Sequence, residues 1–178
     1  LLELFRQHIY GRAPVGRPEQ LSFAVEETDK NAMDGKATRK QIRISFKGPG
    51  GEGSIGVVLF IPNQRAAPAP AFVLICNRPV SNIDPTREKK SPFWPAETII
   101  SRGYAAAAFH VADLDPDEYD EFKNGVHGIF DSKDKPRGAD AWGTIAAWAW
   151  GASRVMDYFE QDEDINAKQV AVIGHSRG

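Results

Sequence analysis

The spacing of apolar residues changes character about 70 residues into the chain. Before that point apolar and polar residues alternate, most clearly in KQIRISFK (40–47), where Ile42, Ile44 and Phe46 occupy every second position. Alternation with a period of two is typical of a strand that buries one face. Three such strands are predicted, at 21–28, 40–47 and 54–61. The glycine- and proline-rich turn at 48–51 joins the second to the third and indicates an antiparallel meander.

Beyond this point the apolar residues form continuous runs, which are typical of strands covered on both faces of a parallel sheet. The runs are AFVLIC (71–76) and YAAAAF (104–109), and QVAVI (169–173) is predicted as a further short apolar strand. Helices are predicted between them, at 94–103 and from Asp140, the expected N-cap, to about Phe159. A short helix is also predicted at 1–10. The order strand, helix, strand, helix, strand predicts an α/β fold with three αβα layers.

Composition indicates one globular domain that spans residues 1–178. The chain is 42% hydrophobic and 26% charged, with a formal net charge of −2. Because there is no basic excess, nucleic acid is not expected as a partner. No apolar stretch approaches the length of a membrane span. The single cysteine, Cys76, lies within an apolar run and is expected to be buried, and neither a metal nor a cofactor is expected.

The sequence GHSRG at 174–178 matches the G-x-S-x-G pattern of serine hydrolases and follows directly on the last predicted strand. In an α/β sheet this position forms a sharp strand-to-helix turn that raises the serine above the carboxyl edge of the sheet. Ser176 is therefore the candidate nucleophile, with an ordinary turn serine as the alternative. A serine hydroxyl needs a histidine to take its proton and an acid to orient that histidine.

In this fold type the histidine and the acid both follow the serine in the chain. The histidines that precede Ser176 are His8, His110, His127 and His175. None of them has the chain order of the base, so the base and the acid are expected after Gly178. His110 ends the strand at 104–109 and is expected to line the substrate site or to have a structural role.

Ester hydrolysis passes through an oxyanion that needs hydrogen-bond donors. One donor is expected from the backbone N–H of Arg177, and a second from the loop Asn77–Ser81, which follows the strand at 71–76. The guanidinium of Arg177 also carries a permanent charge that can bind an oxyanion or a substrate carboxylate, with a plain surface arginine as the alternative. Asn77 and Arg78 are accordingly candidate substrate-binding residues.

Two other clusters contain residue types that bind ligands elsewhere. The segment at 113–122 places Asp113, Asp115 and Asp117 at alternate positions as calcium loops do, but it lacks the glycine turn and the terminal glutamate of an EF-hand, and Pro116 breaks the pattern. A solvated acidic loop is therefore expected there. Trp142, Trp148 and Trp150 could stack on sugar rings, but their place on an amphipathic helix favours the core.

Several longer stretches resemble the bacterial branch of the glucuronoyl esterases, carbohydrate esterase family 15, which are α/β-hydrolases. The matching text is YGRAP near the start, SRGYAAAAFHVADLDPDEYDEFKNGVHGIF (101–130) and AWGTIAAWAWGASRVMDYFEQDEDINAKQVAVIGHSRG (141–178). The last stretch is the most specific. It combines a tryptophan-rich helix ending in S-R-x-M-D-Y with an acidic turn and a strand that runs into G-H-S-R.

By this resemblance, Ser176 looks like the family nucleophile and Arg177 like the arginine that helps to form the oxyanion site. The resemblance implies the N-terminal part of an α/β-hydrolase domain, whose partner is a C-terminal segment holding the acid, the histidine and further substrate contacts. It implies a cofactor-free serine esterase that forms an acyl-enzyme on 4-O-methyl-glucuronoyl esters of lignin–carbohydrate complexes. A secreted or periplasmic bacterial enzyme of lignocellulose degradation is expected, with any targeting segment absent from this chain.

One departure keeps other substrates open. The loop after the strand at 71–76 reads Asn77-Arg78-Pro79, where relatives often carry a glycine- and aromatic-rich segment. The alternatives are an acetyl xylan esterase, a peptidase- or lipase-like enzyme on the same fold, and a non-catalytic carbohydrate-binding relative. Residues 1–178 alone are expected to be inactive and poorly soluble, because the strand at 169–173 would have an open edge.

Overall fold

The alternating segments of the sequence form an antiparallel meander, as predicted. In the computed structural model, which describes residues 1–132 and 134–177, the strands are β1 (Gln20–Asn31), β2 (Ala37–Gly48) and β3 (Gly51–Pro62). A short helical turn, α2 (Ala32–Gly35), connects β1 to β2. All three strands extend beyond their predicted bounds, because backbone pairing continues into the polar residues at their ends.

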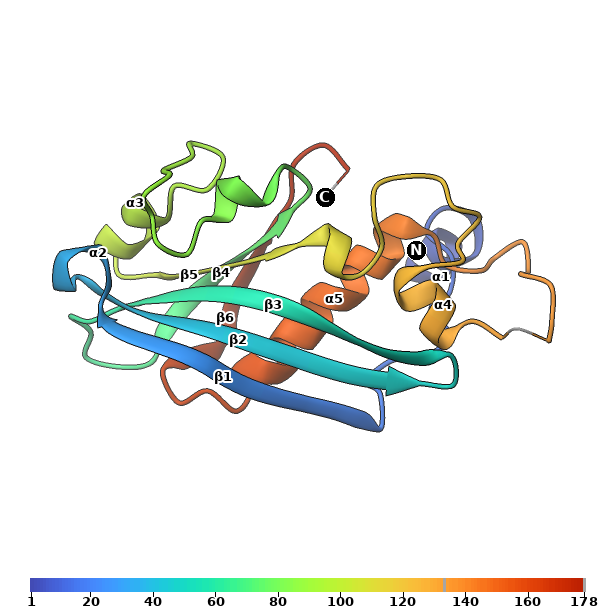
Figure 1. Ribbon diagram of the computed structural model, residues 1–178, viewed down its shortest axis with the longest axis horizontal. Helices are drawn as coiled ribbons and strands as arrows, with labels where there is room; N and C mark the ends of the chain where they lie inside the picture. The colour runs from blue at the N-terminus through green and yellow to red at the C-terminus, as the bar shows by residue number, and fades with distance from the viewer. Residues whose placement is uncertain (133, 178) are drawn as a thin grey trace.

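The continuous apolar runs form the parallel part of the same sheet. They are β4 (Ala69–Cys76), β5 (Ala105–His110) and β6 (Ile165–Ile173). β4 pairs parallel with both β5 and β6, while β5 pairs antiparallel with β3. The strand order is therefore β1-β2-β3-β5-β4-β6 (Figure 1). Because β4, β5 and β6 run in the same direction, the loops that follow them emerge at one edge of the sheet.

Helices cover both faces of the sheet, which confirms the three-layer αβα architecture (Figure 1). α5 (Thr144–Phe159) packs on one face and α3 (Ala96–Ser101) on the other. Alternate residues of β5 separate accordingly: Phe109 joins the core beneath α5, whereas Ala108 joins the core beneath α3. The remaining helical elements are α1 (Leu2–His8), the 3-10 turns η1 (Val80–Ile83) and η2 (Val111–Asp113), and α4 (Gly125–Phe130).

α5 begins later than predicted, and the expectation that Asp140 is its N-cap is wrong. The N-cap is Gly143, whose N–H donates to the carbonyl of Tyr10 at 3.0 Å. Asp140 instead accepts a hydrogen bond from Arg12 at 2.8 Å. Two residues that follow α1 thus bind the segment before α5: Tyr10 accepts from Gly143, and Arg12 donates to Asp140. Because the carboxylate of Asp140 pairs with Arg12, it does not cap the helix.

The residues around α5 confirm the core positions expected from the sequence. Trp142, Trp148 and Trp150 expose 0%, 1% and 5% of their surface. A Cβ atom at position 151 would lie 2.1 Å from Cδ1 of Leu114. Glycine at this position therefore allows α5 to pack closely against Leu114. Cys76 is fully buried, and burial raises the pKa of its thiol. Within the described residues, no helix has the length and apolar character needed to cross a lipid bilayer.

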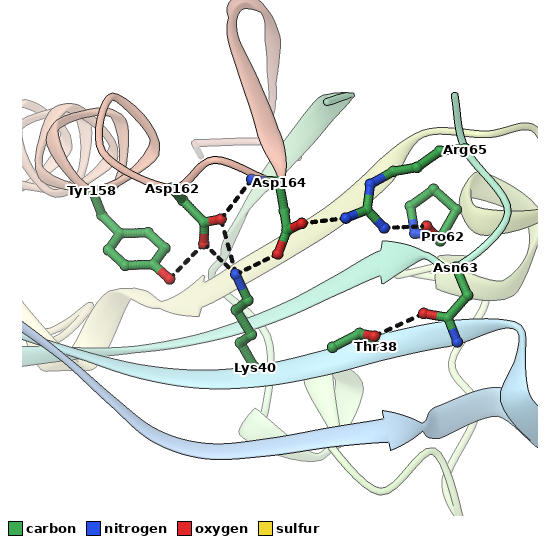
Figure 2. A network of polar contacts seen from close by, with 8 residues as sticks. All are labelled: Thr38, Lys40, Pro62, Asn63, Arg65, Tyr158, Asp162 and Asp164. Carbon is green, nitrogen blue, oxygen red and sulfur yellow. Dashed lines mark hydrogen bonds and ion pairs between the residues drawn. The ribbon is translucent and has the colours of Figure 1, made fainter. Parts of the chain in front are cut away.

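A partly buried polar network ties β2 to the loop before β6 (Figure 2). Lys40 Nζ donates to both carboxylate oxygens of Asp162, at 2.8 and 2.9 Å, and to Asp164 at 2.8 Å. Tyr158 donates its hydroxyl to Asp162 at 2.6 Å, and Arg65 pairs with Asp164. The contacts of Lys40 join segments that lie more than 120 residues apart in the chain, at the opposite end of β6 from Ser176.

The network keeps its members in defined protonation states. Partial burial lowers the pKa of Lys40, but hydrogen bonds to Asp162 and Asp164 outweigh it, so the pKa of the ammonium is raised. The hydrogen bond from Lys40 lowers the pKa of Asp164. Burial and the contact with Asp162 raise the pKa of Tyr158. At neutral pH Lys40 is therefore charged and Tyr158 is a neutral donor.

Candidate active site

Ser176 lies on a sharp turn that begins where β6 ends. The strand ends at Ile173, and the backbone of Ser176 has a φ of +61°. A residue with a side chain adopts this left-handed region at a cost of about 1–2 kcal/mol. Such strain is concentrated at functional sites. The turn thus has the position and backbone conformation of a nucleophile elbow, and it exposes the serine side chain.

Three loops meet beside this turn. Parallel pairing sets Cys76, the last residue of β4, opposite His110, the last residue of β5. It also sets Leu74 of β4 opposite Ile173 of β6. The loop at 77–79, the segment after His110 and the turn at Ser176 therefore share one edge of the sheet. The residues predicted to line the site, Asn77, Arg78 and His110, all lie at this edge.

Side-chain contacts join these loops to one another. Asn77 Nδ2 donates to the carbonyl oxygen of His175 at 2.9 Å, and Arg78 Nη2 lies 3.4 Å from Nδ1 of His175. His110 Nε2 lies 2.8 Å from the carbonyl oxygen of Arg78. The ring of His175 also packs edge-on against Phe93. Asn77, Arg78 and His110 thus contact neighbouring loops, and their substrate-binding roles stay predictions.

Arg177 forms a two-pronged ion pair with Asp117, from the loop after β5. Nη1 donates to Oδ1 at 2.8 Å, and Nη2 donates to Oδ2. A fork of this kind fixes the plane of the guanidinium. The Nε–H of Arg177 takes no part in the pair. Sequence reasoning missed Asp117 as the partner of Arg177, although its place just beyond the carboxyl end of β5 was a usable signal.

Most of the segment at 113–122 is exposed or half-buried, as expected of a solvated acidic loop, but Asp115 is buried and each of the first three aspartates has a protein partner. Asp113 accepts a hydrogen bond from the backbone N–H of Gly56 at 2.9 Å. Asp115 exposes 2% of its surface and lies 3.4 Å from Nε2 of the buried His127. The carboxylates of Asp113, Asp115 and Asp117 thus contact three different partners. In residues 1–132 and 134–177, no group of three potential ligand side chains could hold a metal ion.

None of the four histidines bonds to the serine hydroxyl in the part of the chain that the structure describes. His127 is buried beside Asp115 and Trp142. His110 and His175 are engaged with Arg78. His8 is exposed on α1. The expectation that the catalytic histidine and acid follow Gly178 therefore stays a prediction.

A hollow of about 510 Å³ opens beside Arg177. Its walls include the aromatic residues Tyr10, Tyr119 and Phe122 and the carboxylate of Asp117. The volume lies within the range of about 300–1,000 Å³ that is usual for small-molecule sites. Aromatic rings beside charged groups offer both a stacking surface and hydrogen-bond partners, which suits a sugar ring.

Comparison with known proteins identifies the family. The family described as "Glucuronyl esterase, fungi" matches residues 44–178. The chain is 32% identical over 204 residues to the carbohydrate esterase MZ0003 from an unknown prokaryotic organism, and the match covers 98% of this chain and 46% of that protein.

Solved structures agree in fold and sequence. A glucuronoyl esterase from Solibacter usitatus superposes with a TM-score of 0.86 at 30% identity, over 99% of this chain and 50% of that one. A promiscuous CE15 esterase from a marine bacterial metagenome superposes with a TM-score of 0.78 at 30% identity, over the same shares. The chain thus spans about half the length of these relatives. Because the family match includes the parallel strands and the turn at Ser176, the chain belongs to the glucuronyl esterase family.

Proposed function

We propose that this chain carries the nucleophile and part of the oxyanion site of a serine esterase that hydrolyses carbohydrate esters. Its preferred substrates are 4-O-methyl-glucuronoyl esters of lignin–carbohydrate complexes. The observation that carries the proposal is the strained turn at Ser176, which follows a parallel strand and contacts the loop after β4. The names of two relatives, a glucuronoyl esterase and a carbohydrate esterase, support the substrate class.

In the proposed reaction, Oγ of Ser176 attacks the ester carbonyl carbon while a histidine takes the hydroxyl proton. The carbonyl oxygen becomes an oxyanion, which accepts hydrogen bonds from the N–H of Arg177 and from a donor of the loop at 77–79. Collapse of this intermediate breaks the bond to the alcohol, which leaves with the proton from the histidine. Water then releases the glucuronic acid from the acyl-enzyme by the same steps. In this proposal the catalytic histidine and the carboxylate that orients it follow Gly178 in the chain.

The acyl group of such a substrate is itself a sugar, so recognition requires partners for a charged and hydroxylated ring. The hollow beside Arg177 supports this part of the proposal, because it combines aromatic walls with a guanidinium and a carboxylate. Lignin–carbohydrate esters occur outside cells. The proposal therefore places the protein in the secreted or periplasmic fraction.

A substrate panel tests the proposed function in the protein that carries this chain. We expect hydrolysis of a benzyl ester of 4-O-methyl-glucuronic acid, with a kcat/KM at least about tenfold above that on acetylated xylan, since differential binding of the acyl group sets specificity. A peptide substrate is expected to remain uncleaved. Preference for acetylated xylan would favour the acetyl xylan esterase alternative, and saccharide binding without any turnover would favour the non-catalytic relative.

Removal of the Arg177 side chain tests its role in the oxyanion site. Arg177→Ala keeps the backbone N–H but removes the guanidinium, so kcat on the glucuronate ester is expected to fall about 10²-fold. Arg177→Lys retains the charge without the fork and is expected to give an intermediate kcat. Arg102→Ala, which removes an exposed arginine after α3, serves as the matched control. A kcat of Arg177→Ala within threefold of the unsubstituted protein would exclude the side chain from the reaction.

A further inference from the structure

Both ring nitrogens of His110 have protein partners. The backbone N–H of Ala112 points at Nδ1 from 3.2 Å, so Nδ1 is the acceptor of the ring. In the neutral ring the proton then lies on Nε2, which is 2.8 Å from the carbonyl oxygen of Arg78 and donates to it. No lone pair remains to take a proton from Ser176. The side chain of His110 is therefore a fixed donor to the loop after β4.

The carbonyl that accepts from His110 belongs to the peptide bond between Arg78 and Pro79. The next residue is Pro79, which has no N–H, so this peptide presents only its negative end. If the peptide turned toward the elbow, its carbonyl dipole would repel an oxyanion. With the carbonyl held at His110, the donors that the loop can offer are the N–H groups of Asn77 and Arg78.

The same loop is bonded to the elbow. Asn77 Nδ2 donates to the carbonyl of His175 at 2.9 Å, and Arg78 Nη2 lies 3.4 Å from the ring of His175. His175 directly precedes Ser176. A chain of contacts thus runs from the end of β5, through the loop after β4, to the residue before the candidate nucleophile.

We propose that His110 is a positioning residue for the oxyanion site. Its Nε2–H holds the Arg78 carbonyl away from the reacting atoms and keeps the loop at 77–79 in register with Ser176. This inference rests on the proposed function, because it assigns an oxyanion to the edge where these loops meet. His110 acts through Arg78 and does not touch the substrate.

Two substitutions separate the two hydrogen bonds of the ring. His110→Gln places an amide N–H near the position of Nε2 and can still donate to Arg78. His110→Asn is one methylene shorter, so it can accept from Ala112 but does not reach Arg78. Both variants are polar and uncharged. They differ in the contact that the proposal makes essential, and each is compared with the unsubstituted protein.

The measurements are kcat and KM on the glucuronate ester, the affinity for a tetrahedral boronate or phosphonate analogue, and the affinity for the carboxylate product. His110→Asn is expected to lower kcat about 10–100-fold, the effect of a misplaced catalytic group, with KM and product affinity within threefold. Its affinity for the analogue is expected to fall by the same factor as kcat/KM, because the analogue mimics the transition state. His110→Gln is expected to retain most of the kcat and most of the affinity for the analogue.

Several results would overturn the inference. They are full activity in both variants, higher activity in His110→Asn than in His110→Gln, and an equal loss of product and analogue binding, which would indicate a merely structural role. Failure of the proposed function looks different. In that case the unsubstituted protein itself would show no turnover of the ester and no affinity for the tetrahedral analogue.

Discussion

Replacing Ser176 by alanine in the protein that carries this chain is expected to abolish ester hydrolysis and to leave the fold intact. The substitution removes the atom that attacks the carbonyl, and loss of a serine nucleophile lowers kcat by about 10⁴–10⁶-fold. Alanine keeps the Cβ, so the strain of the left-handed backbone is unchanged. The change removes one hydroxyl group and no packing carbon, so stability is expected to change by less than about 1 kcal/mol.

The measurement is kcat on the glucuronate ester, together with circular dichroism and the thermal unfolding midpoint. Ser101→Ala provides a matched control, because Ser101 is exposed at the end of α3 and its hydroxyl bonds only within its own turn, to Thr98. A Ser176→Ala variant that retains a tenth of the activity would rule out the acyl-enzyme mechanism. Mass spectrometry after treatment with a fluorophosphonate should place the adduct on Ser176 in the active protein.

Asp162→Asn is expected to destabilise the protein by about 3 kcal/mol, because it removes one partner of a buried ion pair. The Asp162 side chain is 3% exposed and that of Lys40 is 15% exposed, so the ammonium would lose its main counter-charge with little access to water. The substitution would also set an amide N–H donor among the three donors from Lys40, Tyr158 and the backbone of Asp164. Denaturant unfolding of the whole protein measures the loss.

The neighbouring acid supplies the control for this prediction. Glu163→Gln is also a carboxylate-to-amide change in the same loop, but Glu163 is exposed and should give a change below about 0.5 kcal/mol. Combining Asp162→Asn with Lys40→Met should recover part of the loss, because no charge of this pair then stays buried without a partner. If Asp162→Asn cost less than about 1 kcal/mol, the pair would be no stronger than an exposed ion pair.

The strands were predictable because their signal is local. Ile42, Ile44 and Phe46 alternate because one face of β2 is buried, and the runs in β4 and β5 lack alternation because both faces are covered. The α5 cap was not predictable in the same way. Asp140 has the right residue type for a cap, but its carboxylate is taken by Arg12, which lies 128 residues away in the chain.

By itself, the sequence determined the α/β order of elements and the position of the candidate nucleophile, because both depend on neighbouring residues: burial on one or two faces, and a glycine-flanked serine after a strand. The tertiary structure alone decided the partners. Arg177 pairs with Asp117 across 60 residues, and His110 holds the carbonyl of Arg78 across 32. These contacts follow from the insertion of β5 between β3 and β4, and strand order is a property of the assembled sheet that no local pattern encodes.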